Sequence, residues 1–461
     1  MGVIRLALLV FLALVSTCAA DFRAGVARVD ITPRTAIWMS GYGDRKHPSE
    51  GVLHPLWAKA LAIEDGKHNR IVIVTTDLIG LPRAISDLVA ARLNQQFGLE
   101  RSQLLLNSSH THTGPMVRRN LQTMFDLSAE DQATINGYGN QLVENLYSVA
   151  GAALSKLEPA NLSYGFGEAH FAVNRREVTD SGVKTGVNPS GPVDPQVPVI
   201  RVTALDGSLK AVLFAYACHN TTLTGQFYEL SGDYAGFAQI ELEKQHPGAN
   251  AMFMMLCGAD QNPNPRSTLE LAQQHGKTLA SEVERVLASA QTALKAPIST
   301  AFESIELEFA LHTREVFEEE ARNANPARVR RARAMLQAYD ERHPIRFTPY
   351  PIQAVRFNKG LTILALGGEV VVDYDLRAKR EYSGVPLIVA GYSNDVMSYI
   401  PSQRVLHEGG YEAVDSMTYY GQPGPYADDV EDRIFTGIHQ ILKRVGLSDT
   451  RSHHPAKQST Q

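Results

Sequence analysis

Histidines stand at the ends of strand-like apolar runs in this sequence. Leu104–Leu106 leads into NSSHTHTGP, residues 107–115, which places His110 and His112 two positions apart. In an extended chain, side chains two apart point to the same side, so both imidazoles can face one pocket. Two structural histidines beside the Gly114–Pro115 turn explain an isolated His-x-His equally well.

Two further motifs follow apolar runs in the same way. His219 comes directly after Ala211–Ala217, and Glu369 follows Leu361–Leu366 through two glycines. Ligands tend to bind where the strands of an open α/β sheet end. A carboxylate joined to two imidazoles is a common catalytic zinc shell that leaves a position for water. Taken alone, Glu369 is more typical of an acidic surface loop.

The elements that must position these residues alternate between strands and helices. Ile71–Thr75 is a continuous β-branched run, the pattern of a strand that is buried on both faces. Further strands are expected at Val197–Val202, Ala211–Ala217, Ala251–Leu256, Leu361–Leu366 and Pro386–Ala390, and helices at Ile85–Phe97, Gln141–Leu154, Thr268–Leu287 and Glu315–Arg342. This alternation predicts an α/β fold: a layered domain with a mixed, largely buried β-sheet flanked by helices, and a metal site at strand ends.

Composition and charge bound the function. The chain has 461 residues, of which 44% are hydrophobic and 20% charged, as in ordinary globular proteins. A net charge of −5 argues against nucleic acid as a partner. Residues 1–20 are typical of a secretory signal peptide cleaved near Ala20, so we expect a secreted or periplasmic protein. Residues 21–447 are expected to form the catalytic domain, and residues 448–461 a polar, disordered tail.

Two cysteines are expected in the mature chain, Cys218 and Cys257. An oxidising compartment allows a disulfide between them. Both lie in apolar strand-like runs, which favours two buried free thiols.

Motifs along nearly the whole mature chain carry a family resemblance. The sequence resembles the N-terminal catalytic domain of the neutral/alkaline non-lysosomal ceramidase family in AGVARVDITPRTAIWMSGYGDR (24–45), TTDLIGLP (75–82), SSHTHTGP (108–115), FAVNRR (171–176), ACHNT (217–221), GDYAG (232–236), GADQNPN (258–264), GGE (367–369) and YSNDVMSYIPSQRVLHEGGYE (392–412). His-Thr-His followed by Thr-Gly-Pro is the most specific of these elements.

The resemblance implies a role for each matching residue. His110, His219, Glu369 and Tyr399 would bind Zn²⁺, and His112 would face the reaction centre and move protons. Tyr399 would also stabilise developing negative charge, and Arg175 would bind an oxygen of the substrate, with Arg176 as the alternative one residue on. The implied activity is that of a zinc amidohydrolase of sphingolipid metabolism, acting on a lipid or small-molecule amide with peripheral membrane contact.

One position departs from the family pattern. The family carries Gly-Asp-Val-Ser-Pro-Asn, whose serine is assigned as the nucleophile, whereas Asn262 stands at that place here. An amide cannot form an acyl intermediate as serine does, but it can donate a hydrogen bond to an oxyanion. We therefore expect hydrolysis by zinc-activated water. The alternatives are a non-catalytic lipid- or small-molecule-binding relative, or a zinc hydrolase of another amide or ester, such as an acylated sugar.

Overall fold

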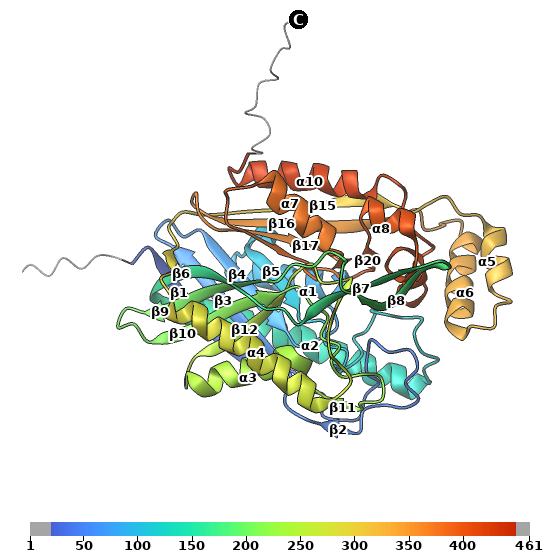
Figure 1. The fold of residues 1–461 in the computed structure, drawn as a ribbon, viewed down its shortest axis with the longest axis horizontal. Coiled ribbons are helices and arrows are strands. Elements are labelled where there is room, and N and C mark those ends of the chain that lie inside the picture. Colours follow the sequence, from blue (N-terminus) through green and yellow to red (C-terminus); the bar gives the residue numbers. More distant parts are fainter. Residues whose placement is uncertain (1–19, 449–461) are drawn as a thin grey trace, which may run out of the picture.

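Two β-sheets pack face to face in the protein, and helices cover both outer faces (Figure 1). The computed structural model describes residues 20–448. The larger sheet has nine strands. Eight of them lie side by side in the order β12 (Asn250–Met255), β10 (Leu209–Tyr216), β9 (Gln196–Ala204), β6 (Glu158–Glu168), β1 (Phe22–Asp30), β3 (Trp57–Asp65), β4 (Arg70–Thr76) and β5 (Leu104–Ser108). The ninth strand, β14 (Thr292–Ala293), pairs with β6. The pairs β4–β5 and β10–β12 are parallel and the other neighbouring pairs among the eight are antiparallel, so the sheet is mixed.

The smaller sheet lies over the larger one. Its strands run in the order β15 (Ile298–Glu308), β16 (Phe347–Phe357), β17 (Thr362–Leu366) and β19 (Leu387–Ala390). Figure 1 shows α7 (Val372–Glu381) and α10 (Val430–Arg444) above this sheet. Beneath the larger sheet lie α1 (Arg83–Phe97), α2 (Ala129–Ser155), α3 (Asp233–Gln245) and α4 (Leu269–Ala288). These layers confirm the predicted α/β domain with a mixed, buried sheet flanked by helices.

Alternating side chains explain why the larger sheet is buried on both faces. Ile71 and Ile73 point into the core between the two sheets, whereas Val72 and Val74 point into the core beneath α1 and α2. Successive side chains of a strand point to opposite faces, so an uninterrupted apolar run serves two cores at once. The predicted strand Ile71–Thr75 is therefore confirmed as an interior strand.

Short elements gather at one end of the two sheets. A three-stranded sheet consists of β7 (Ala172–Thr179), β8 (Gly182–Asn188) and β13 (Gln261–Pro263), and a parallel pair of β18 (Glu369–Val370) and β20 (Tyr399–Ile400). They are followed along the chain by α8 (Gln403–Glu408), a π-helical turn η2 (Tyr411–Asp415) and α9 (Met417–Tyr420). Three other short elements are β2 (Gly51–Val52), β11 (Glu229–Leu230) and η1 (Arg101–Gln103).

The prediction of one continuous helix at Glu315–Arg342 is wrong. The segment forms two helices, α5 (Arg314–Glu320) and α6 (Pro326–Asp340), which protrude at one end of the molecule (Figure 1). Asn325 caps α6 by accepting a hydrogen bond from the Ala327 amide, and Pro326 is the first helical residue. Proline fits the first turn of a helix but not its interior, so the chain restarts there.

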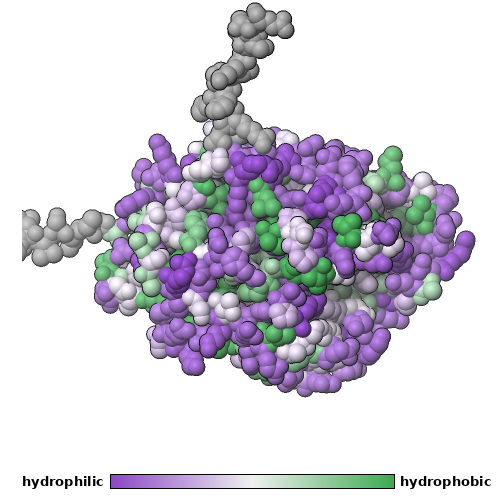
Figure 2. All heavy atoms as spheres, viewed as in Figure 1, coloured by the Kyte–Doolittle hydropathy of each residue, from purple (hydrophilic) through white to green (hydrophobic). Residues whose placement is uncertain are grey.

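The structure tests the expectation about the cysteines but not the expectations about the two ends of the chain. Cys218 and Cys257 are both buried and free, as the thiol interpretation predicted. The expected signal peptide and polar tail lie almost entirely outside the described residues 20–448. Within that range, none of the helices combines the length and apolar character that a bilayer crossing requires. Figure 2 shows a face covered largely by hydrophilic residues, with apolar residues in small separate groups.

Candidate metal centre and active site

The two histidines after β5 meet even though the chain between them is not extended. His110 has φ +62°, and its amide donates to the Leu78 carbonyl. The His112 amide donates to the Asn220 carbonyl, which ties this loop to the segment after β10. Their Nε2 atoms lie 3.0 Å apart. The sequence therefore predicted the convergence correctly, but a left-handed turn produces it and not a strand.

Backbone carbonyls orient two of the imidazoles. His110 Nδ1 lies 2.6 Å from the Ile79 carbonyl, and His219 Nδ1 lies 2.8 Å from the Gly258 carbonyl. A proton on each Nδ1 leaves the Nε2 lone pair free, which is the usual arrangement of a metal-binding histidine.

The two free Nε2 atoms face the same carboxylate oxygen. Glu369 Oε2 lies 3.0 Å from His110 Nε2 and 3.2 Å from His219 Nε2, and the Tyr399 hydroxyl lies 3.2 Å from His219 Nε2. Ligand atoms around a tetrahedral zinc with bonds of about 2.0–2.1 Å are separated by roughly 3.3 Å. The spacing and the donor types of this cluster therefore fit zinc. Glu369 is only 2% exposed, which excludes the surface-loop interpretation of this residue.

Burial and charge favour metal-competent protonation states. Burial, together with the nearby Arg175 guanidinium, lowers the pKa of His219 to about 3. Burial alone would raise the pKa of Glu369, but His110 and His219 hold it well below its ordinary value. Near neutral pH the site thus presents a neutral imidazole beside a carboxylate, so a proton does not compete for the His219 lone pair.

His112 differs from the other two histidines. Its Nδ1 is buried without a hydrogen-bond partner, and Gly41 packs so closely that an added Cβ would lie 2.3 Å from that atom. Burial, followed by the neighbouring His110, lowers its pKa well below the ordinary value. The ligand atoms of His110, His112 and His219 all lie within 4.8 Å of one another, so this buried group can hold a metal ion.

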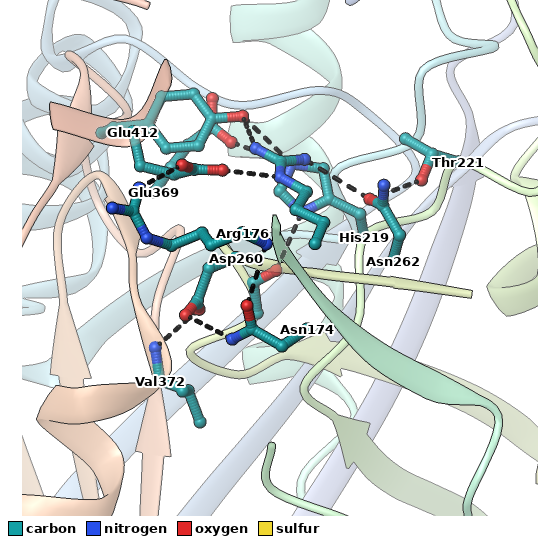
Figure 3. Close-up of polar contacts among 12 residues, drawn as sticks. Asn174, Arg176, His219, Thr221, Asp260, Asn262, Glu369, Val372 and Glu412 are labelled. Carbon is teal, nitrogen blue, oxygen red and sulfur yellow. Dashed lines mark hydrogen bonds and ion pairs between the residues drawn. The ribbon is translucent and has the colours of Figure 1, made fainter. Parts of the chain in front are cut away.

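Arg175 and not Arg176 faces this cluster. Arg175 Nη2 donates to the Tyr399 hydroxyl at 2.9 Å, and its Nε donates to Glu412 at 2.8 Å. Arg176 donates to the other oxygen of Glu412 at 2.6 Å (Figure 3) and to Glu408 at 2.9 Å. Glu412 thus holds both arginines, and the Arg175 guanidinium is left beside the candidate metal ligands.

Asn262 lies next to the same guanidinium. Its Oδ1 accepts from Arg175 Nη1 at 3.4 Å and from the Thr221 hydroxyl at 3.3 Å (Figure 3). With the oxygen so engaged, the amide NH₂ group is left to donate. The residue is 6% exposed.

Asp260, which directly precedes β13, links β7 to α7 through hydrogen bonds next to the candidate site. Its carbonyl accepts from the Arg175 amide at 2.8 Å, and its carboxylate accepts from Asn174 at 3.0 Å and from the Val372 amide at 2.9 Å (Figure 3). Burial raises the pKa of the carboxyl to about 6, although these hydrogen bonds oppose the rise. Asp260 thereby fixes the backbone that carries Arg175.

Residues 22–298 match the model of the neutral/alkaline non-lysosomal ceramidase family, N-terminal part. The chain belongs to this family.

Individual ceramidases are similar over part of the chain. A neutral ceramidase from Pseudomonas aeruginosa is 29% identical over 269 residues, which are 55% of this chain and 39% of that protein. A neutral ceramidase from Drosophila melanogaster is 24% identical over 288 residues, 56% of this chain and 39% of that protein. The match therefore spans about two fifths of the length of these curated relatives.

Solved ceramidase structures share the fold over a longer stretch. The crystal structure of neutral ceramidase from Pseudomonas aeruginosa has a TM-score of 0.71 at 20% identity, covering 93% of this chain and 75% of that one. A structure of ceramidase complexed with C2 has the same TM-score at 19% identity, covering 96% and 77%. The ceramidase fold thus extends well past residue 298, into the segments that carry Glu369 and Tyr399.

The structure brings together all the residues that the sequence singled out, namely His110, His112, Arg175, His219, Asn262, Glu369 and Tyr399. Sequence reasoning missed Thr221, Glu412 and Tyr420, although Thr221 and Glu412 lie inside quoted ceramidase motifs. Their roles depend on where their side chains end, and spacing along the chain does not encode that.

Replacing Glu412 with alanine is expected to lower the free energy of unfolding by about 3–5 kcal/mol, because it leaves the buried Arg175 without a counter-charge and Arg176 with Glu408 alone. Arg175 is 5% exposed and Arg176 2%. Urea unfolding followed by circular dichroism measures the loss.

Glu408→Ala is the matched control for this prediction. Glu408 also pairs with Arg176, but its side chain is 30% exposed, so we expect a loss of about 0–1 kcal/mol. Equal losses in the two variants would contradict the role given to Glu412.

Proposed function

We propose that this chain is an exported, zinc-dependent hydrolase of an amide bond, and that N-acyl lipids are its favoured substrate class. The observation that carries the proposal is the buried convergence of His110, His219, Glu369 and Tyr399 beside Arg175 and His112. Membership in the ceramidase family and the names of its relatives support the choice of an amide.

Each residue has a task in such a reaction. A zinc ion in this cluster supplies a Lewis acid and lowers the pKa of a water molecule to about 7. Arg175 and Tyr399 present N–H and O–H donors to the substrate carbonyl oxygen, where negative charge develops. With both arginines tied to Glu412, these donors are held in place before the substrate arrives.

His112 is placed to move a proton. Its Nδ1 is buried without a hydrogen-bond partner, and its Nε2, 3.0 Å from His110 Nε2, is the nitrogen that faces the cluster. A neutral imidazole with its Nε2 lone pair free can take up the proton that the attacking water releases, and the imidazolium can then pass that proton to the departing amine.

A second candidate function rests on Asn262. Because an amide replaces the serine of the family, a binding protein that keeps the fold without turnover is the principal alternative, and a zinc hydrolase of another amide or ester is the next. The test is an assay of purified protein against short-chain fluorescent ceramide and a panel of acylated amides and sugars. Hydrolysis that a chelator abolishes and zinc restores supports the proposal, whereas ligand binding without any turnover supports the alternative.

Asn262→Ala is expected to lower turnover by roughly 10²–10³-fold without abolishing it, if the free NH₂ group donates to the oxyanion. The measurement is kcat on the substrate that the panel identifies. No acyl-enzyme should accumulate, and a serine-directed reagent should leave the wild type active.

Asn262→Ser provides the sharper comparison. If serine switches on ceramide hydrolysis in an otherwise inactive parent, the wild type is a binding relative. Trapping an acyl group on any wild-type side chain would defeat direct attack by water.

A further inference from the structure

The second oxygen of Glu369 has its own partner. While Oε2 faces His110 and His219, Oε1 accepts a hydrogen bond from the Tyr420 hydroxyl. The carboxylate is 2% exposed, so water does not take this place from the outside. A buried carboxylate oxygen that accepts no hydrogen bond destabilises the folded protein. The hydrogen bond from Tyr420 therefore helps to hold the Glu369 carboxylate in place.

Tyr420 is itself held from several sides. It is the last residue of α9, which ends at Gly421 with φ +66°. The neighbouring Thr418 carbonyl accepts from the Thr123 hydroxyl, and the Tyr419 carbonyl accepts from the Thr123 amide. The Tyr420 ring lies edge-on to the Tyr399 ring, with centroids 6.4 Å apart. A ring that is fixed in this way presents its hydroxyl in one direction.

Another tyrosine near the carboxylate is less well placed. The Tyr392 hydroxyl lies 3.5 Å from Oε2, at the outer limit of hydrogen bonding. It also approaches the oxygen that faces the imidazoles, so it cannot restrain Oε1. Tyr420 alone among the described hydroxyls is bonded to that atom.

We propose that Tyr420 is a positioning residue that fixes Glu369 as a zinc ligand through a single oxygen, Oε2. This inference rests on the proposed function, because it requires zinc at the cluster. Without the Tyr420 hydroxyl, the carboxylate is free to rotate, and its Oε1 lacks a partner. Groups that orient metal ligands typically contribute about 10–100-fold to metal affinity.

The test is Tyr420→Phe, which keeps the ring and removes only the hydroxyl. The dissociation constant for Zn²⁺, measured by competition with a chromophoric chelator, is expected to rise about 10–100-fold. Replacement of zinc by Co²⁺ adds a readout of ligand geometry, because its visible bands depend on the number and arrangement of ligands, and we expect these bands to shift.

Tyr374→Phe is the matched control. Tyr374 is also a buried tyrosine, but its hydroxyl donates to the Pro401 carbonyl at 3.1 Å. Its removal should leave the zinc affinity and the Co²⁺ spectrum unchanged, even if it lowers the thermal stability of the metal-free protein. Unchanged zinc affinity and spectrum in Tyr420→Phe would overturn the inference and leave the proposed function intact. A wild type that binds no zinc would overturn both.

Discussion

His219→Ala is expected to reduce bound zinc from a single ion per chain to background. The imidazole is buried, it remains neutral because its pKa is about 3, and the Gly258 carbonyl directs its Nε2 toward Glu369 and Tyr399. Alanine removes one of four proposed ligands and leaves a single imidazole, a carboxylate and a hydroxyl, a set that holds a borderline-soft ion poorly. Metal analysis of purified, dialysed protein measures the loss, and His110→Ala should behave in the same way.

A buried histidine elsewhere provides the control. His275 is 5% exposed, and its Nε2 lies 2.7 Å from the Pro265 carbonyl, in a different part of the fold. His275→Ala should therefore keep full zinc occupancy even if it lowers stability. Full occupancy in both His219→Ala and His110→Ala would rule out the proposed zinc ligands.

His112→Ala is expected to keep zinc and to lose turnover by about 10²–10⁴-fold, the usual contribution of a general acid–base group. No backbone carbonyl orients its ring, in contrast to His110 and His219, and its Nδ1 is unpartnered. In the proposed site, four other side chains already supply the ligands. The measurements are kcat and zinc content on the same preparation.

The paired readouts make this prediction sharp. If zinc and activity disappear together in His112→Ala, His112 is a ligand and the set of four is wrong. If both persist, proton transfer belongs to another group.

Most of the strands that the sequence predicted carry apolar runs without a charged residue, and Val197–Val202, which contains Pro198 and Arg201, is an exception. Apolar runs of this kind are buried on both faces, and that environment leaves a plain signature, as in Ile71–Thr75. The strand β16 was not predicted, and it contains Pro349 and Pro351, although proline is disfavoured in a central strand. The structure shows why they are tolerated: pairing with β17 begins only at Ile352, so the prolines sit opposite β15 alone.

The residues of the candidate site also fall into those that the sequence indicated and those that it did not. Histidines and a glutamate at strand ends are visible in the sequence, although their strands lie in two sheets: β5 and β10 belong to the larger sheet, and Glu369 follows β17 of the smaller one. Glu412 and Tyr420 are not visible in this way, because both come from short helical turns outside the sheets. Only the folded chain shows that one carboxylate pairs with two arginines and that one hydroxyl restrains another carboxylate.

The residues of the candidate site are spread widely along the chain. Arg175 and Tyr399 are 224 residues apart and still share a hydrogen bond. The segment that matches the family model, residues 22–298, contains the histidines but neither Glu369 nor Tyr399. A fragment that contains only that segment would have the three histidines but would lack Glu369 and Tyr399. The candidate site is therefore complete only where the segment after residue 298 is present as well.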